Sequence, residues 1–354
     1  MGFSLGIVGL PNVGKSTLFN ALSHTKVEVS NYPFCTINPN VGVVYVPDDR
    51  LEKIHQIMGS PKTVPTILEF FDIAGLVKGA HRGEGLGNLF LSHIREVDAV
   101  AQVVRCFSDP NITHVSGAVD PQKDIEIINA ELILADMHLV DKKITALRLA
   151  AKTSDPKILK QLKHYEGLYD HLGRGQPARS FTEEAELSLL TAKPILYVAN
   201  VDETGNPDQV KIIEEIVKGE GGAVISLCAK LEAELLDLNE AEAAEYMREA
   251  GLKERGLKRL IVAGYKLLNL VTFYTSNEKE TRAWTVKTGT AAPQAAGRVH
   301  SDMEKGFIAA EVAHYNDLLK AGSYEALRKL GLLHTEGREY QVQDGDLVLF
   351  RFNI

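Results

Sequence analysis

The stretch Gly9-Leu10-Pro11-Asn12-Val13-Gly14-Lys15-Ser16 decides the fold of this chain. It fits the P-loop pattern G-x-x-x-x-G-K-[ST], whose glycine-rich turn binds the phosphates of a nucleoside triphosphate. The apolar run at residues 5–8 predicts a buried strand before the loop. Leu18, Ala21 and Leu22 fall on one face of a predicted helix after it. The strand, turn and helix together predict a nucleotide-binding α/β domain.

The residue types in this loop suit phosphate chemistry. The glycines let backbone N–H groups point inward, and the helix N-terminus adds the positive end of its dipole. Lys15 is expected to reach the β- and γ-phosphates and to act in catalysis, and Ser16 to ligate Mg²⁺. The expected phosphate-binding residues are Asn12, Val13, Gly14, Lys15, Ser16 and Thr17.

Length and composition set the class of protein. A chain of 354 residues is long enough for two or three domains, and 45% apolar with 24% charged residues is typical of globular proteins. A net charge of −8 gives no overall attraction for nucleic acid. Three widely spaced cysteines, no signal peptide and no long apolar run predict a cytoplasmic protein without a membrane segment.

Alternating apolar and glycine-rich segments predict the domain organisation. The α/β pattern of residues 1–106 stops near residue 120 and resumes at residue 194, so one nucleotide-binding domain is expected over residues 1–270. Residues 121–190 carry two helical patterns, which predict an inserted coiled-coil hairpin that projects as an arm. Residues 271–354 predict a small separate α+β domain. No apolar stripe is left over for self-association, which favours a monomer.

Two segments behind the P-loop resemble nucleotide-sensing loops. Thr36 lies in a polar loop and is expected to complete the Mg²⁺ shell when a γ-phosphate is bound. Asp72 follows a predicted strand within D-x-x-G, where it can hold Mg²⁺ through water. The N–H of Gly75 is expected to face the γ-phosphate and to contribute to catalysis.

The base-recognition segment departs from the guanine-binding pattern N-K-x-D. It reads Asn200-Val201-Asp202-Glu203, with Val201 in the lysine position and Glu203 in the aspartate position. Asn200 can still bond a purine N7, but the longer carboxylate cannot repeat the guanine contacts, so ATP is expected to bind at least as well as GTP. The alternative is that Asp202 or Glu203 reads guanine. The turn Ser226-Leu227-Cys228 is expected to back the base.

The residue after Gly75 is Leu76, where Ras-like enzymes carry the glutamine that orients water. Another group must therefore act, or hydrolysis stays slow until a partner helps. His114, in the loop after the next strand, is the main candidate for orienting or deprotonating water, and His81 and Arg82 are the alternatives.

Several stretches together resemble one family over essentially the whole chain. They are GLPNVGKST at residue 9, NYPFCT at 31, DIAGLVKGAHRGEGLGN at 72, NVDE at 200, TRAWTVKTGT at 281 and AAGRVHSDMEKGFIAAEV at 295. Together they resemble the YchF subfamily of Obg-like ATPases. The resemblance implies a TGS domain of β-grasp fold at the C-terminus and a Mg²⁺-dependent ATPase linked to translation. It also implies adenine contacts by the backbone beside Val201.

The function that follows is an ATPase switch that hydrolyses ATP to ADP and associates with the ribosome. Contact with rRNA or tRNA through the arm or the TGS domain is a further expectation. Two alternatives remain open at this point. One is a true GTPase switch, and the other is a nucleotide-gated binding module whose hydrolysis is incidental.

Overall fold

The computed structural model describes residues 2–24, 27, 32, 39–73, 86–114, 117–151, 155–183, 186–220 and 222–353. Contacts among them form two compact units. The first unit takes its described residues from 1–26, 35–44 and 69–267, and the second from 27–34, 45–68 and 268–354. Within these described ranges, no helix combines the length and apolar character needed to cross a lipid bilayer.

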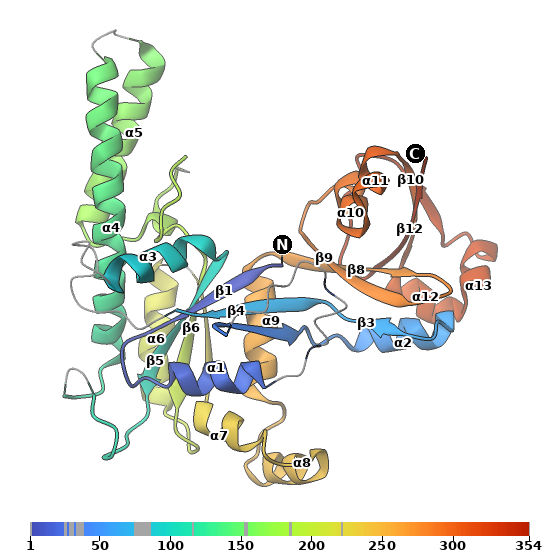
Figure 1. The fold of residues 1–354 in the computed structure, drawn as a ribbon, viewed down its shortest axis with the longest axis horizontal. Coiled ribbons are helices and arrows are strands. Elements are labelled where there is room, and N and C mark those ends of the chain that lie inside the picture. The colour runs from blue at the N-terminus through green and yellow to red at the C-terminus, as the bar shows by residue number, and fades with distance from the viewer. Residues whose placement is uncertain are drawn as a thin grey trace. The chain divides into compact units, whose positions relative to one another are not determined.

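The first unit is built on a six-stranded sheet (Figure 1). Strand β1 pairs in parallel with β4 and β5, and the parallel ladder continues through β6 to β7. The order across the sheet is β2 (Val41–Tyr45), β4 (Ile67–Asp72), β1 (Ser4–Val8), β5 (Ala99–Cys106), β6 (Ile195–Val201) and β7 (Ala223–Leu227). Every residue of β1, β5 and β6 is buried, which explains why these strands appear in the sequence as apolar runs. The predicted P-loop α/β fold is confirmed.

Helices join the strands in the order expected for this fold. They are α1 (Lys15–Ser23), α3 (Leu86–Glu96), α6 (Pro207–Glu220), α7 (Ala229–Glu234), α8 (Glu240–Glu249) and α9 (Gly256–Leu267). Helix α9 ends at Leu267 because Asn269 takes a positive φ of 53° and β8 begins at Leu270.

The arm consists of α4 (Pro121–Ala150) and α5 (Pro156–Gly173), which lie side by side in Figure 1. Each helix starts with an aspartate cap followed by proline, a strong N-terminal signal. Ile144 and Leu147 of α4 pack with Tyr165 and Leu168 of α5 in one apolar cluster.

A buried aspartate fixes the arm to the returning chain. Asp136 of α4 has no exposed surface, and its carboxylate accepts hydrogen bonds from the N–H of Leu190 and Thr191, both at 2.8 Å, and from the Thr191 hydroxyl at 2.7 Å. Burial raises the pKa of Asp136, while the Thr191 and Leu190 hydrogen bonds act to lower it. These three donors offset the cost of burying the carboxylate, so the arm is held at this point.

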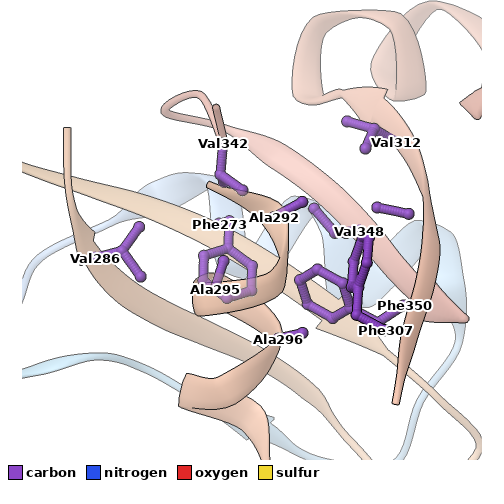
Figure 2. Packing of buried hydrophobic residues seen from close by; sticks show 11 residues of the cluster. Phe273, Val286, Ala292, Ala295, Ala296, Phe307, Val312, Val342, Val348 and Phe350 are labelled. Carbon is purple, nitrogen blue, oxygen red and sulfur yellow. The ribbon is translucent and has the colours of Figure 1, made fainter. Parts of the chain in front are cut away.

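The second unit is a β-grasp-like sheet crossed by helix α10 (Ala292–Val299). The strand order is β11 (His334–Glu336), β10 (Phe307–His314), β12 (Asp346–Phe352), β8 (Leu270–Ser276), β9 (Thr281–Lys287) and β3 (Thr63–Val64). The remaining helices are α2 (Asp49–Met58), α11 (Ser301–Lys305), α12 (Tyr315–Ala321) and α13 (Tyr324–Lys329). Phe273, Phe307 and Phe350 meet beneath α10, with Phe273 and Phe350 edge to face at 5.9 Å (Figure 2).

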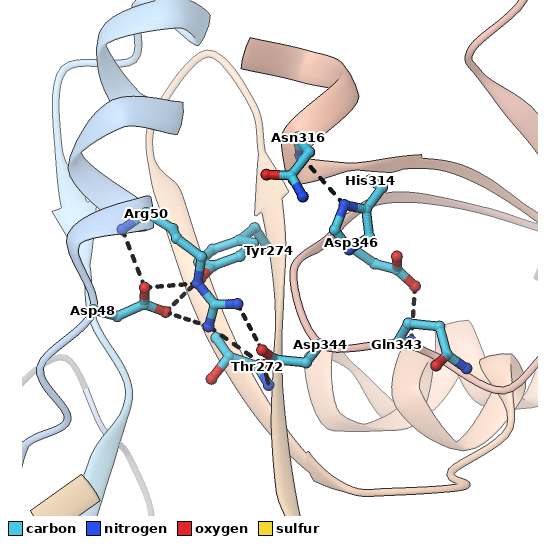
Figure 3. A network of polar contacts seen from close by, with 9 residues as sticks. All are labelled: Asp48, Arg50, Thr272, Tyr274, His314, Asn316, Gln343, Asp344 and Asp346. Atoms are coloured by element: carbon cyan, nitrogen blue, oxygen red, sulfur yellow. Dashed lines mark hydrogen bonds and ion pairs between the residues drawn. The ribbon is translucent and has the colours of Figure 1, made fainter. Parts of the chain in front are cut away.

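Residues 45–68 group with this second unit, although the sequence suggested a boundary near residue 270. Leu51 and Ile54 of α2 pack in a cluster with Tyr274, and β3 pairs in parallel with β9. Arg50 adds polar contacts, with Nε 2.8 Å from Asp48 and Nη1 2.7 Å from Asp344 (Figure 3). Apart from Asp48, these partners lie more than 200 positions away along the chain, so no local sequence pattern predicts the contacts.

Candidate nucleotide site

A cavity of about 600 Å³ lies in the first unit, where the carboxyl ends of its strands meet. It is lined by four segments, at residues 12–17, 107–112, 200–203 and 228–230. These are the P-loop and the turns after β5, β6 and β7. Ligands of open α/β sheets bind at this edge.

Both P-loop glycines are required by close contacts. A Cβ on Gly9 would lie 2.7 Å from the carbonyl oxygen of Val103, which belongs to the neighbouring strand. Gly14, the residue before α1, has a φ of 98°, and a Cβ there would lie 2.2 Å from Nδ2 of Asn200. The turn can therefore bring its N–H groups and the N-terminus of α1 to the cavity only with glycine at both positions.

Asn12 joins the P-loop to the turn after β5. Its backbone has a φ of 63°, which asparagine tolerates better than most residues, and its Nδ2 donates to the carbonyl of Thr113 at 3.1 Å. A movement of the P-loop would therefore displace the loop that carries Thr113, because this hydrogen bond joins them directly.

The charged groups at the phosphate end are Lys15 and Asp72. Lys15 lines the cavity, and its Nζ donates to the carbonyl of Leu10 at 2.9 Å. Burial lowers the pKa of Lys15, and the negative charge of Asp72 opposes that shift. Burial likewise raises the pKa of Asp72, and Lys15 opposes the shift. The two groups are therefore electrostatic neighbours, although Asp72 does not line the cavity itself.

The residues present fit a Mg²⁺ ion that is shared with phosphates. The exposed side chain of Ser16 lines the cavity, and Asp72 supplies a carboxylate on the same side as Lys15. Mg²⁺ is usually held by one or two protein groups together with substrate phosphates and water, which is the number of groups that Ser16 and Asp72 would supply. Among the described residues, no three acidic, histidine or cysteine side chains gather into a metal cluster.

Asn200 holds the base end of the cavity together. Its side chain is buried, Oδ1 accepts from the N–H of Ala229 at 2.9 Å, and Nδ2 donates to the carbonyl of Val13 at 2.9 Å. One amide hydrogen remains for a ring nitrogen of the base, because each side-chain amide carries two. Asn200 thus ties the P-loop to the turn after β7 and also lines the cavity.

The carboxylate in the guanine-reading position already has a partner. Glu203 Oε1 lies 3.1 Å from Nζ of Lys230, and Val201 lines the cavity where guanine sites carry a lysine stem. Both members of the pair are partly exposed, so its contribution to stability is small. It does compete for the carboxylate oxygens that guanine would need.

His114 does not line the cavity. Its side chain is 3% exposed, and Nε2 lies 3.0 Å from Oδ2 of Asp124 in the first turn of α4. Three further predicted binding residues do not line the cavity: Val13 and Leu227 are buried, and Ser226 offers its carbonyl to Arg259 at 2.7 Å. Thr36, Gly75, Leu76, His81 and Arg82 lie outside the described residues.

Four residues that were not predicted from the sequence line the cavity from the turn after β5: Phe107, Ser108, Asp109 and Ile112. The signal was available, because β5 neighbours β1 in the sheet and its following turn must therefore meet the P-loop. Lys230 was not predicted either. It lines the cavity because it follows the end of β7, and no motif in the sequence marks it.

Two family descriptions match the chain. One, a 50S ribosome-binding GTPase family, matches residues 4–148, and the other, the YchF-GTPase C-terminal family described as a protein of unknown function (DUF933), matches residues 270–353. Curated relatives align with the chain over its whole length and over their own whole length. The chain is 53% identical to the Bacillus subtilis protein and 48% identical to the Escherichia coli O157:H7 protein, each named ribosome-binding ATPase YchF.

Solved structures agree with these matches. The Schizosaccharomyces pombe YchF GTPase is 38% identical, with a TM-score of 0.88 over 99% of this chain and 98% of that one. A GTP-binding protein from Pyrococcus horikoshii, 18% identical with a TM-score of 0.63, shares the fold over 99% of this chain and all of its own length.

Proposed function

The chain belongs to the YchF family of P-loop proteins, and from this premise we propose that it is a Mg²⁺-dependent ATPase that associates with the ribosome. It would hydrolyse ATP to ADP and act as a nucleotide-dependent switch. Association with ribosomes implies a cytoplasmic protein, and we propose that one chain is the functional unit.

The observation that carries the choice of ATP is the base end of the cavity. Guanine recognition requires a carboxylate that accepts two hydrogen bonds, but Glu203 is engaged by Lys230 and Val201 replaces the lysine. Adenine needs neither group, because it offers an acceptor at N1 and a donor at N6. Asn200 and the backbone beside Val201 are the groups that we propose to contact it.

The phosphate end supports binding of a nucleoside triphosphate. Lys15, the P-loop N–H groups and the N-terminus of α1 would hold the phosphates, with Ser16 and Asp72 holding Mg²⁺. When bound, the ion neutralises phosphate charge. We propose that Thr36 and Gly75 contact the ion and the γ-phosphate, and that His114 positions the attacking water after leaving its buried position.

A GTPase is the second candidate. It is favoured by the name of the fission yeast relative and by the family description that matches residues 4–148. It requires Glu203 to leave Lys230, or Asp202, which also lines the cavity, to take over the contact with guanine.

Calorimetric titration of the nucleotide-free protein with ATP and with GTP, both with Mg²⁺, separates the two. We expect ATP to bind at least as tightly as GTP. A preference for GTP of about tenfold, or about 1.4 kcal/mol, would overturn the ATPase proposal.

We also propose that the arm contacts rRNA or tRNA. The exposed side chains of Lys157, Lys160 and Lys163 follow one face of α5 at a spacing of three residues, in a protein whose net charge is −8. Phosphate backbones bind such rows of cations, and the affinity falls as salt rises. The second unit is the alternative contact.

The triple variant Lys157→Glu, Lys160→Glu, Lys163→Glu tests the arm. We expect weaker co-sedimentation with ribosomes and a shallower salt dependence than in the wild type. Lys211→Glu with Lys218→Glu on exposed positions of α6 is the matched control. Equal loss in both variants would count against a contact through the arm.

A further inference from the structure

The loop between β5 and α4 connects the nucleotide cavity to the arm. Its first part lines the cavity through Phe107, Asp109 and Ile112, and the carbonyl of Thr113 accepts from the P-loop side chain Asn12. The next residue, His114, is buried against α4. The loop therefore contacts the P-loop in its first part and the arm helix α4 in its second.

Arg105 holds the first part of this loop in shape. Its side chain is 2% exposed at the end of β5, and its guanidinium donates to three loop carbonyls: Phe107 at 3.2 Å, Asp109 at 3.4 Å and Ile112 at 2.9 Å. The loop is thus fixed up to Ile112, and the segment that carries His114 is fixed by other contacts.

His114 is held by Asp124, which lies in the first turn of α4. The side chains of both residues are 3% exposed, and one hydrogen bond of 3.0 Å joins them. No described residue bonds the other carboxylate oxygen, Oδ1, which is buried. Burial raises the pKa of Asp124, and the hydrogen bond and charge of His114 oppose the shift.

A second aspartate on the same helix gives the comparison. Asp136 accepts three hydrogen bonds and has donors for both oxygens. Asp124 has a donor for only one oxygen. A half-satisfied buried carboxylate is held less tightly than a satisfied one, so the contact between Asp124 and His114 is the more easily released of the two.

Helix α4 runs without interruption from Asp124 to the tip of the arm, a length of roughly 40 Å at 1.5 Å per residue. A small tilt of the arm would therefore move Asp124 relative to the loop. We propose that Asp124 is a positioning residue, which holds His114 away from the nucleotide until a partner moves α4. This inference rests on the proposed function, in which His114 positions water.

The test is steady-state ATP hydrolysis with and without purified ribosomes. In Asp124→Asn, which removes the charge and keeps the shape, we expect the ribosome-free kcat to rise roughly tenfold, with KM unchanged, because a charge-assisted hydrogen bond is lost. The ribosome should then stimulate hydrolysis less than it does in the wild type. Adding His114→Ala should remove the gain.

The matched control is Asp120→Asn, which removes the same charge at the capping residue of α4 and keeps an effective cap. Its hydrolysis should equal that of the wild type. A fall in the kcat of Asp124→Asn would overturn the inference, because Asp124 would then be assisting His114. An unchanged kcat with full stimulation would overturn it as well.

Hydrogen exchange of the wild-type protein gives a second measurement that needs no variant. Amides of residues 111–124 should exchange faster when ribosomes are bound, and unchanged or slower exchange would contradict the inference. If the wild type neither hydrolyses ATP nor binds ribosomes, the proposed function itself fails. If it does both and Asp124→Asn has no effect, only the role of Asp124 fails.

Discussion

Gly14 and Asn200 lie so close together that a Cβ atom on Gly14 would be 2.2 Å from Nδ2 of Asn200. The Asn200 side chain cannot move aside without losing hydrogen bonds, because Nδ2 donates to Val13 and Oδ1 accepts from Ala229. This contact couples the phosphate end of the cavity to the base end, and it makes the P-loop glycine a packing requirement as well as a conformational one.

The variant Gly14→Ala should therefore bind ATP at least tenfold more weakly and lose about 1–3 kcal/mol of stability, from a φ of 98° and from the clash. Calorimetry and urea denaturation measure the two effects. Gly175→Ala is the control, since Gly175 has a φ of 79° but no atom within 4 Å of the added Cβ. It should lose stability through strain alone and keep its affinity for ATP.

Restoring the guanine-reading residues should change base selection. In Val201→Lys with Glu203→Asp, we expect affinity for GTP to rise by about tenfold. The shorter carboxylate can accept the two hydrogen bonds that guanine donates, and the lysine stem can pack against the base. The measurement is titration with both nucleotides. Glu215→Asp, the same change on an exposed position of α6, should leave selection unaltered. Unchanged GTP affinity in the double variant would show that other residues read the base.

Removing the anchor of the arm should destabilise the first unit. Asp136→Ala leaves the Leu190 and Thr191 N–H groups and the Thr191 hydroxyl without their acceptor, at a cost of about 3 kcal/mol. Thermal unfolding followed by circular dichroism measures the loss. Asp141→Ala, on an exposed position of the same helix, should change stability by no more than about 0.5 kcal/mol. Equal effects of the two substitutions would disprove an anchoring role.

The second unit should lose stability in acid partly through Asp344. Burial acts to raise the pKa of Asp344, but hydrogen bonds from Arg50 and from the Thr272 backbone outweigh it, so the pKa is below its ordinary value (Figure 3). The ionised form is thus favoured by folding. Its contribution is present above the unfolded pKa of about 3.9 and is lost as pH falls through the lowered folded value.

In Asp344→Asn, stability measured by urea denaturation should therefore differ less between pH 7 and mildly acidic solution near pH 3 than it does in the wild type. Asp317→Asn, which alters an exposed helical ion pair with Lys320, is the control. The assignment is wrong if the wild type and Asp344→Asn lose the same stability over this range.

The sheet of the first unit could be predicted because its strands are buried on both faces and leave apolar runs in the sequence. The arm was predictable for a related reason, since its apolar positions repeat at helical spacing. Its first helix spans residues 121–150 and begins at the cap formed by Asp120 and Pro121, a start signal that is visible in the sequence.

Pairings over long distances could not be predicted in the same way. Strand β3 has two residues, and its partner β9 lies more than 200 positions along the chain. Strand β10 gives only a weak sequence signal because its alternation is irregular, with exposed Ile308 beside half-buried Ala309. In the site, loop composition indicated His114 as a candidate, but only the fold shows that Asp124 holds it.

The central position of β12 has a consequence for synthesis of the chain. This strand, residues 346–352, lies between β10 and β8 in the sheet of the second unit, yet it follows both of them in the sequence. The sheet therefore cannot close until β12 has been synthesised. Until then β10 and β8 each have an unpaired edge, which is the kind of surface that favours aggregation of a nascent chain.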